Sequence, residues 1–218
     1  MRIAGIDPGL RSGGLVLVET DPERVLASVS MVEKAGESKQ ARAEAEELAE
    51  PLGGWSDKQF AAAVLRAERW MERFAAAFAE LEKAHGRAEM IACESFVDQP
   101  SKAKKEKAGL LARRWQTPLL TGFLIPWLAA RGYTVANGRL VFQNAGIVIP
   151  QFRSELAMLE RGRAADKEAV VAGATLVGND HERKALVHAL ALAIRVRRHR
   201  PQLAVQTANE TYVPASNG

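Results

Sequence analysis

The chain has 218 residues, 47% of them hydrophobic and 26% charged, which is enough to bury the core of one globular domain. No apolar stretch is long enough to span a bilayer, and no charged leader precedes the first apolar segment, so we expect neither a membrane protein nor a signal peptide. The only cysteine, Cys93, excludes an internal disulfide, suits a reducing compartment and is expected in the core.

Positive charge is concentrated in two segments, although the formal net charge is only +4. The first segment contains Lys102, Lys104, Lys105, Lys107, Arg113 and Arg114. The second contains Arg195, Arg197, Arg198 and Arg200. A solvated helix face would explain either cluster alone. Two clusters in a chain that also carries an acidic site favour a nucleic acid partner.

The N-terminal quarter predicts three short strands, at residues 2–7, 13–18 and 25–32, with a turn at residues 21–23. Residues 34–50 are rich in Ala, Glu, Lys and Arg, and they predict either an exposed helix or a mobile arm. Three consecutive strands pair most simply as antiparallel hairpins.

A long helix is expected next, from a capping box at Ser56 and Gln59 to a stop at Gly86. Apolar residues recur along it at three- and four-residue spacing, which predicts a single buried stripe. The stripe consists of Phe60, Val64, Ala67, Trp70, Met71, Phe74, Phe78 and Leu81. We interpret it as core packing and not as a cofactor site.

The middle of the chain predicts a strand at 89–94, a lysine-rich loop at 98–108 and a helix at 110–128 that is kinked near its prolines. A short strand is expected at 133–136, whereas residues 137–165 show no clear pattern.

Helices are expected at 167–176 and from Asn179 to about Arg198, the latter with a capping pattern of Asn179 and Glu182. We assign residues 1–200 to one domain and residues 201–218 to a polar, disordered tail.

Two acidic residues end apolar strands in matching contexts. Asp7 ends the first strand before a Pro-Gly turn, and Glu94 ends the strand at 89–94. The element order predicts an α/β fold with a mixed five-stranded sheet flanked by helices, the later strands joining in parallel through right-handed crossovers. If these two strands are neighbours, both carboxylates lie at the same edge, where Mg²⁺ or Mn²⁺ would relieve their repulsion.

In these segments the chain resembles the RuvC-type Holliday junction resolvases of the RNase H-like nuclease superfamily, and more closely their divergent phage members. The resemblance covers roughly residues 1–198. It depends on Gly5-Ile6-Asp7-Pro8-Gly9, Ile91-Ala92-Cys93-Glu94, Ala165-Asp166-Lys167, and the last helix from His181 to Leu190.

This resemblance implies a homodimer that cuts symmetric four-way DNA junctions with two divalent cations, in the cytoplasm of a bacterium or of a phage-infected host. It implies that Asp7 and Glu94 bind metal, with further ligands from the start of the last helix, where His181 and Asp180 lie. His181 would bind a cation or activate the attacking water.

The last helix departs from the family pattern, in which an acid or His is followed three residues later by an acid and then Ala. His181 takes the first position, but Lys184 takes the second. In another register His188 takes the second position and Ala185 the first. Three interpretations remain open: Asp180 supplies the missing oxygen, Lys184 occupies the space of a cation, or Lys184 is an inactivating change.

The resemblance also implies DNA contacts beyond Glu94. An aromatic residue just past this acid enters the junction in the family, and Phe96 is the candidate here, although the usual offset falls on Val97. The basic residues of the first cluster would bind phosphates. The alternatives to a junction endonuclease are a catalytically silent junction-binding protein, favoured by Lys184, and an RNase H-like nuclease acting on RNA or other branched nucleic acid.

Overall fold

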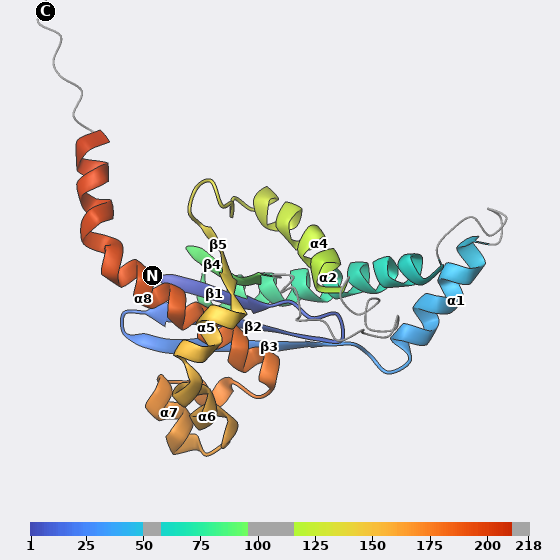
Figure 1. Ribbon diagram of the computed structural model, residues 1–218, viewed down its shortest axis with the longest axis horizontal. Helices are drawn as coiled ribbons and strands as arrows, with labels where there is room; N and C mark the ends of the chain where they lie inside the picture. Colours follow the sequence, from blue (N-terminus) through green and yellow to red (C-terminus); the bar gives the residue numbers. More distant parts are fainter. Residues whose placement is uncertain (50–57, 96–115, 211–218) are drawn as a thin grey trace, which may run out of the picture.

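The fold is built on one five-stranded sheet in the order β3-β2-β1-β4-β5 (Figure 1). The structure, a computed structural model, describes residues 1–49, 58–95 and 116–210. The strands are β1 (Arg2–Asp7), β2 (Ser12–Thr20), β3 (Glu23–Val32), β4 (Met90–Ser95) and β5 (Leu140–Asn144). β1, β2 and β3 pair in antiparallel fashion, whereas β4 pairs in parallel with β1 and β5 in parallel with β4. The predicted mixed sheet is confirmed.

Helices cover both faces of this sheet (Figure 1). One face packs against α2 (Lys58–His85) and α4 (Gln116–Ala130). The other packs against α8 (Asp180–Glu210), which crosses β1 and β2. The remaining helices are α1 (Glu37–Ala49), α5 (Ala145–Gln151), α6 (Arg153–Glu160), α7 (Ala164–Val170) and the short 3-10 helix η2 (Ala174–Leu176).

The face under α2 is filled by aromatic side chains. Trp70 stacks on Phe74 with ring centroids 5.2 Å apart, and Trp127 of α4 meets Phe74 and Phe78 edge-on. Trp70 and Phe74 are fully buried. From Ala67 to Phe78 the stripe of α2 is therefore core, as predicted, whereas Phe60 at its start is 46% exposed. Gly86 ends the helix in the left-handed conformation (φ 81°). The predicted capping box at Ser56 lies outside the described residues.

On the face under α8, two glycines of the sheet let the helix come close. A Cβ on Gly5 would overlap the carbonyl oxygen of Ala185, and a Cβ on Gly14 would overlap that of His181. Gly14 lies directly opposite Asp7 in the β1–β2 pair. Because glycine has no side chain at these two points, the first turns of α8 lie directly above the end of β1.

In the segment predicted as a helix or a mobile arm, residues 37–49 form the helix α1, which is held against α2. In α1, Ala41 and Ala45 are fully buried. Arg73 of α2 donates to Glu37 at 2.9 Å, and Arg69 to Glu44 at 2.5 Å. Figure 1 shows α1 and the adjoining end of α2 extending past the edge of the sheet.

Three predicted elements differ in the structure. The strand predicted at residues 133–136 is a turn. In this turn the hydroxyl of buried Tyr133 donates to the Ala88 carbonyl, and the side chains of Thr134 and Asn137 each accept from the backbone N–H of the other residue. The chain reverses again at Gly138 (φ 71°), and only then does β5 begin.

The two C-terminal helices also differ from expectation. The helix expected at 167–176 is divided into α7 and η2 because the chain turns at Gly173 (φ 76°). The last helix continues to Glu210, so residues 201–210, which we expected in a disordered tail, extend α8. Among the described residues, no helix combines the length and apolar character needed to cross a membrane.

Candidate active site

The two predicted carboxylates meet at the ends of neighbouring parallel strands. Ile6 of β1 is in register with Cys93 of β4, so Asp7 and Glu94 follow side by side. The two carboxyl groups lie close enough for each to influence the pKa of the other. Asp7 is almost fully buried, with 5% of its surface exposed, whereas Glu94 is partly open to solvent. The strand order alone thus creates an acidic pair at one edge of the sheet.

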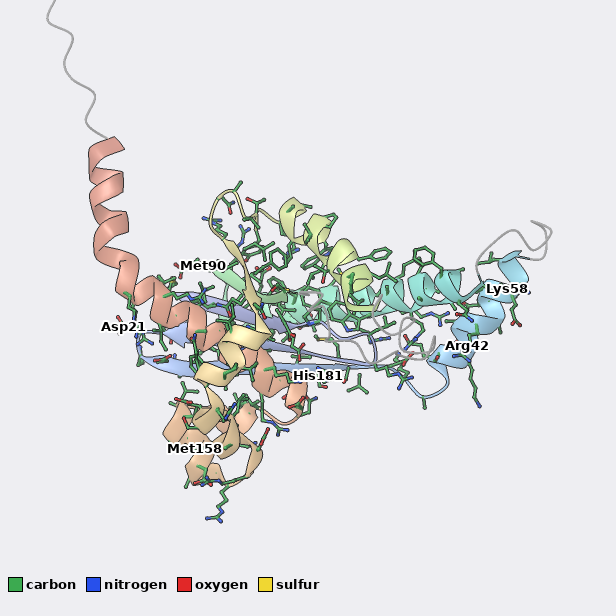
Figure 2. All side chains as sticks on the ribbon, in the orientation of Figure 1. Asp21, Arg42, Lys58, Met90, Met158 and His181 are labelled. Carbon is green, nitrogen blue, oxygen red and sulfur yellow. The ribbon has the colours of Figure 1, made fainter. Side chains whose placement is uncertain are left out.

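One face of α8 lies above this pair and carries three basic side chains. His181, Lys184 and His188 follow one another at spacings of three and four residues, which places them on the same side of the helix. His181 donates from Nδ1 to Oδ2 of Asp7 at 2.8 Å. His188 Nε2 lies 3.8 Å from Oε2 of Glu94. Figure 2 shows His181 on the first turn of α8, beside the strands.

Lys184 lies between the two histidines. Its Nζ is 2.6 Å from Oδ2 of Asp180, one helical turn earlier. Burial alone would lower the pKa of Lys184, but the contact with Asp180 and the negative charges of Asp7 and Glu94 raise it above its ordinary value. Lys184 is therefore a cation at neutral pH, paired with Asp180 and close enough to Asp7 and Glu94 to interact with their charges.

The acidic pair is electrostatically unequal. Burial, reinforced by the charge of Glu94, raises the pKa of Asp7 to about 6 even though His181 hydrogen-bonds to it. Burial also acts to raise the pKa of Glu94, but His188, Asp7 and the charge of Lys184 together hold it below its usual range. The hydrogen bond to Asp7 raises the pKa of His181. Without a bound cation, the site keeps Glu94 ionised and lets Asp7 take a proton near pH 6.

The start of α8 is fixed by its own cap and by β3. The backbone N–H of Glu182 donates to Oδ1 of Asn179 at 2.9 Å, which confirms the predicted capping pattern. Ser28 of β3 donates to Oε2 of Glu182 at 2.8 Å, and Asn179 donates to the hydroxyl of Ser30. These contacts, far apart in sequence, determine where His181 and Lys184 stand above the sheet.

Gln143 was not identified from the sequence. It lies on β5 in register with Glu94, is 1% exposed, and accepts a hydrogen bond from Nδ1 of His188 at 2.9 Å as its amide is oriented here. The signal was the run Leu140-Val141-Phe142-Gln143, an apolar strand ending in a polar residue like the strands of Asp7 and Glu94. Asp7, Glu94 and Gln143 thus form one polar row across three adjacent strands.

Several predicted site residues lie outside the described part of the chain. These are Phe96, Lys102, Lys104, Lys105, Lys107, Arg113 and Arg114, all between residues 96 and 115. The second basic cluster lies at the opposite end of the sheet from Asp7, where Arg197 of α8 pairs with Glu23 at the start of β3. Its position therefore does not support a role beside the carboxylates.

The residues at this edge fit one hard divalent cation better than two. Burial and the charge of Glu94 raise the pKa of Asp7, and a cation bound to oxygen would replace the proton that Asp7 takes up. In the described residues no group of three or more His, Cys, Asp and Glu side chains is arranged to hold a metal ion. Of the two other candidate ligands, His181 is hydrogen-bonded to Asp7 and Asp180 is paired with Lys184.

The strand order and the placement of the helices match an RNase H-like fold. Comparisons with models of known protein families and with curated proteins find no match. Among solved structures, the chain is similar to Thermus thermophilus RuvC in complex with a Holliday junction substrate, with 18% identity, a TM-score of 0.53, and coverage of 91% of this chain and 96% of that one. A second structure of Thermus thermophilus RuvC has 19% identity and a TM-score of 0.49 with the same coverage. At such identities the similarity shows the fold.

Proposed function

We propose that this protein is a divalent-cation-dependent endonuclease that cuts branched DNA, with the four-way junction as its preferred substrate. The observation that carries the proposal is the pair Asp7 and Glu94, adjacent on parallel strands beneath a basic helix face, in a chain that shares its fold with a junction-bound RuvC. A junction endonuclease would act in the cytoplasm of a bacterium or of a phage-infected host.

The proposed chemistry assigns a role to each side chain of the site. Asp7 and Glu94 would hold Mg²⁺ or Mn²⁺, which when bound lowers the pKa of water and stabilises charge on phosphate oxygens. His181, fixed through Nδ1 by Asp7, keeps its second ring nitrogen available to take a proton from the attacking water. The ammonium group of Lys184 would neutralise charge on the scissile phosphate.

The resemblance implies two cations per site, and the described residues supply oxygen ligands more readily for one. Asp7 and Glu94 supply oxygen ligands for one cation. A second would require Asp180 to exchange its contact with Lys184 for the metal. Lys184 thus offers one fixed positive charge in the region where the resemblance implies a second metal.

A catalytically impaired junction-binding protein is the second candidate, and the Lys184–Asp180 ion pair is the observation that favours it. A protonated amine cannot bind a cation, and its charge repels one. Replacing Lys184→Asp separates the two candidates. An impaired protein should gain cleavage in this variant, whereas an active enzyme that uses Lys184 at the phosphate should lose it.

DNA contacts outside the acidic site remain part of the proposal. We propose that Phe96 stacks on bases at the junction and that the basic residues between 102 and 114 bind phosphates near the cleavage point. Substitution of two lysines in this cluster should weaken binding to every DNA substrate and reduce the salt dependence of binding.

The homodimer implied by the family resemblance has support in α4. Its 15 residues include no charged side chain. Its outer surface presents Gly122, Ile125, Pro126 and Ala129, with Ile125 40% exposed. We propose that two copies meet through this surface. Ile125→Lys should then convert the dimer to a monomer in sedimentation experiments, while Val135→Lys, on another exposed residue, should not.

The experiment that tests the function offers the protein three substrates at equal concentration: a synthetic four-way junction, a linear duplex of the same sequence, and an RNA–DNA hybrid. With Mg²⁺ or Mn²⁺ we expect symmetric nicks in the junction and little cleavage of the others. Preferred cleavage of the hybrid would assign the site to RNA processing. Absence of both binding and cleavage would contradict the proposal.

A further inference from the structure

His188 is the one group of the basic helix face whose function the proposed mechanism leaves open. It is fully buried, although imidazole is polar and usually keeps contact with water. Its two ring nitrogens face two polar residues on adjacent strands. Nδ1 lies 2.9 Å from Oε1 of Gln143, and Nε2 lies 3.8 Å from Oε2 of Glu94. His188 therefore connects a buried amide to the acidic pair.

The placement of these three residues follows from the sheet. Glu94 and Gln143 are paired in register on the parallel strands β4 and β5, so their side chains project from the same face. α8 crosses that face and directs His188 between them. Gln143 has no contact with solvent that would explain a polar side chain at this core position, since only 1% of it is exposed.

Two buried nitrogens in this group lack a hydrogen-bond partner as the side chains are oriented here: Nε2 of Gln143 and Nε2 of His188. An unpartnered buried donor costs about 1–3 kcal/mol. Turning the Gln143 amide by half a revolution exchanges its oxygen and nitrogen, which have almost the same shape. The amide nitrogen then donates to Nδ1, and the ring proton moves to Nε2, where it faces the Glu94 carboxylate.

We propose that Gln143 and His188 form a relay that positions Glu94, in which Gln143 fixes the imidazole ring and Nε2–H of His188 donates to Oε2 of Glu94. The 3.8 Å separation is long for a hydrogen bond, and a small rotation of the partly exposed Glu94 side chain closes it. One carboxylate oxygen is then held by the relay, and the other is left for a cation. His188 is a positioning residue and not a metal ligand, because its Nε2 carries a proton.

This inference rests on the proposed function only because it takes Glu94 as a cation ligand. The contacts of His188 with Gln143 and Glu94 do not depend on a bound cation or on DNA. Partners that orient a metal ligand typically change metal affinity or activity by about 10–100-fold when they are removed. The relay therefore predicts a measurable effect on cation binding without DNA, and a spectroscopic signature without cation.

The first experiment records the imidazole ¹⁵N spectrum of the full-length, cation-free protein labelled at histidine, at pH 8. The chain has four histidines, and the signal missing in His188→Gln assigns the ring of His188. We expect a proton on Nε2, and a shift of that nitrogen in Glu94→Gln. A bare Nε2, or no response to Glu94→Gln, would overturn the relay. This experiment holds neither DNA nor metal, so its result is independent of whether the chain is a nuclease.

The second experiment measures Mn²⁺ binding to DNA-free protein for two matched variants. The amide of Gln reaches the position of Nε2, whereas the shorter Asn reaches only that of Nδ1. His188→Gln keeps the contact with Glu94, and we expect it to retain most of the affinity for Mn²⁺. His188→Asn keeps the contact with Gln143, and we expect at least about a tenfold loss.

A purely structural role for His188 predicts the reverse order, because only Asn preserves the buried bond to Gln143. Equal affinities in the two folded variants would also contradict the relay. Thermal unfolding identifies a variant that fails to fold, and in that case the imidazole spectrum of the wild-type chain and of Glu94→Gln decides the question.

Discussion

The two faces of the sheet use different kinds of side chain for different purposes. On the α2 face, large rings fill the space between helix and sheet: Trp70, Phe74 and Phe78 with Trp127 of α4. On the α8 face, Gly5 and Gly14 remove side chains where helix and sheet meet. The aromatic face stabilises the domain. On the other face, the close approach of α8 brings His181 within hydrogen-bonding distance of Asp7 and places His188 Nε2 3.8 Å from Oε2 of Glu94.

This difference explains why the site is formed on the α8 side. A helix held away by aromatic rings could not place short side chains such as His181 against a carboxylate at a strand end. Close approach also buries Asp7, and burial strengthens its electrostatic interaction with His181. The residues that stabilise the domain and the residues of the candidate site thus lie on opposite faces of the sheet. Substitutions on one face should therefore affect mainly stability, and substitutions on the other face mainly the site.

The largest expected effect is on the aromatic face. Phe74→Ala removes a fully buried ring that contacts three other aromatic residues, and should lower the free energy of unfolding by about 3–5 kcal/mol. Urea unfolding measures this, with Val135→Ala, 65% exposed, as a control expected within about 0.5 kcal/mol. Below its unfolding temperature, Phe74→Ala should still bind Mn²⁺. Loss of Mn²⁺ binding in the folded variant would show that the two faces are not independent.

A smaller stability effect, combined with loss of the site, is expected at Gly14. The added methyl group of Gly14→Ala overlaps the backbone of His181 and Glu182, so α8 must move away. Overpacking of this kind costs about 1–3 kcal/mol. Mn²⁺ affinity should fall in the same variant because His181 moves with the helix.

The control for Gly14→Ala is Val135→Ala, at an exposed position outside α8 and outside the proposed dimer surface. This change should alter the free energy of unfolding by no more than about 0.5 kcal/mol. Equal losses in the two variants would mean that close packing of α8 has no special importance.

The cap of α8 should have an effect of about 1 kcal/mol. Asn179→Ala removes the acceptor for the backbone of Glu182 and the contact with Ser30. Calorimetry should show lower stability, and junction cleavage should fall more than stability does because the first turn carries His181. A fall in stability with unchanged cleavage would mean that the cap does not position the site.

The smallest expected effect is that of pH. Because burial raises the pKa of Asp7 to about 6, a cation must displace a proton below that pH. Mn²⁺ affinity should rise about fivefold from pH 5 to pH 6 and become constant above pH 7.

The same titration sets the stability of the cation-free protein. The pKa of Asp7 is higher in the folded than in the unfolded chain, so this group favours folding below about pH 4 and loses that contribution as the pH rises to 6. In Asp7→Asn, neither the Mn²⁺ affinity nor the stability should change with pH through the titration of residue 7. A flat affinity profile in the wild type would contradict a buried, cation-binding Asp7.

The sequence predicted the acidic half of the site better than the basic half. Asp7 and Glu94 were paired correctly because strand order and parallel pairing decide their positions. The pairing of Lys184 with Asp180 follows from their i,i+4 spacing on one helix. The pairing of His188 with Gln143 depends on how α8 is rotated above the sheet, which helical periodicity leaves undefined. The sequence did not identify Gln143 because it predicts the last strand at 133–136 and not at 140–144. Tyr133 is buried, as a strand residue would be, but it lies in a turn.

The measurement that tests the central claim most directly is single-turnover cleavage of a four-way junction by wild-type protein and Asp7→Asn, with junction affinity measured in parallel. We predict that the wild type nicks the junction with Mg²⁺ or Mn²⁺, and that Asp7→Asn binds the junction with similar affinity but does not cut it. Equal cleavage by both proteins would show that the acidic pair is not the catalytic site.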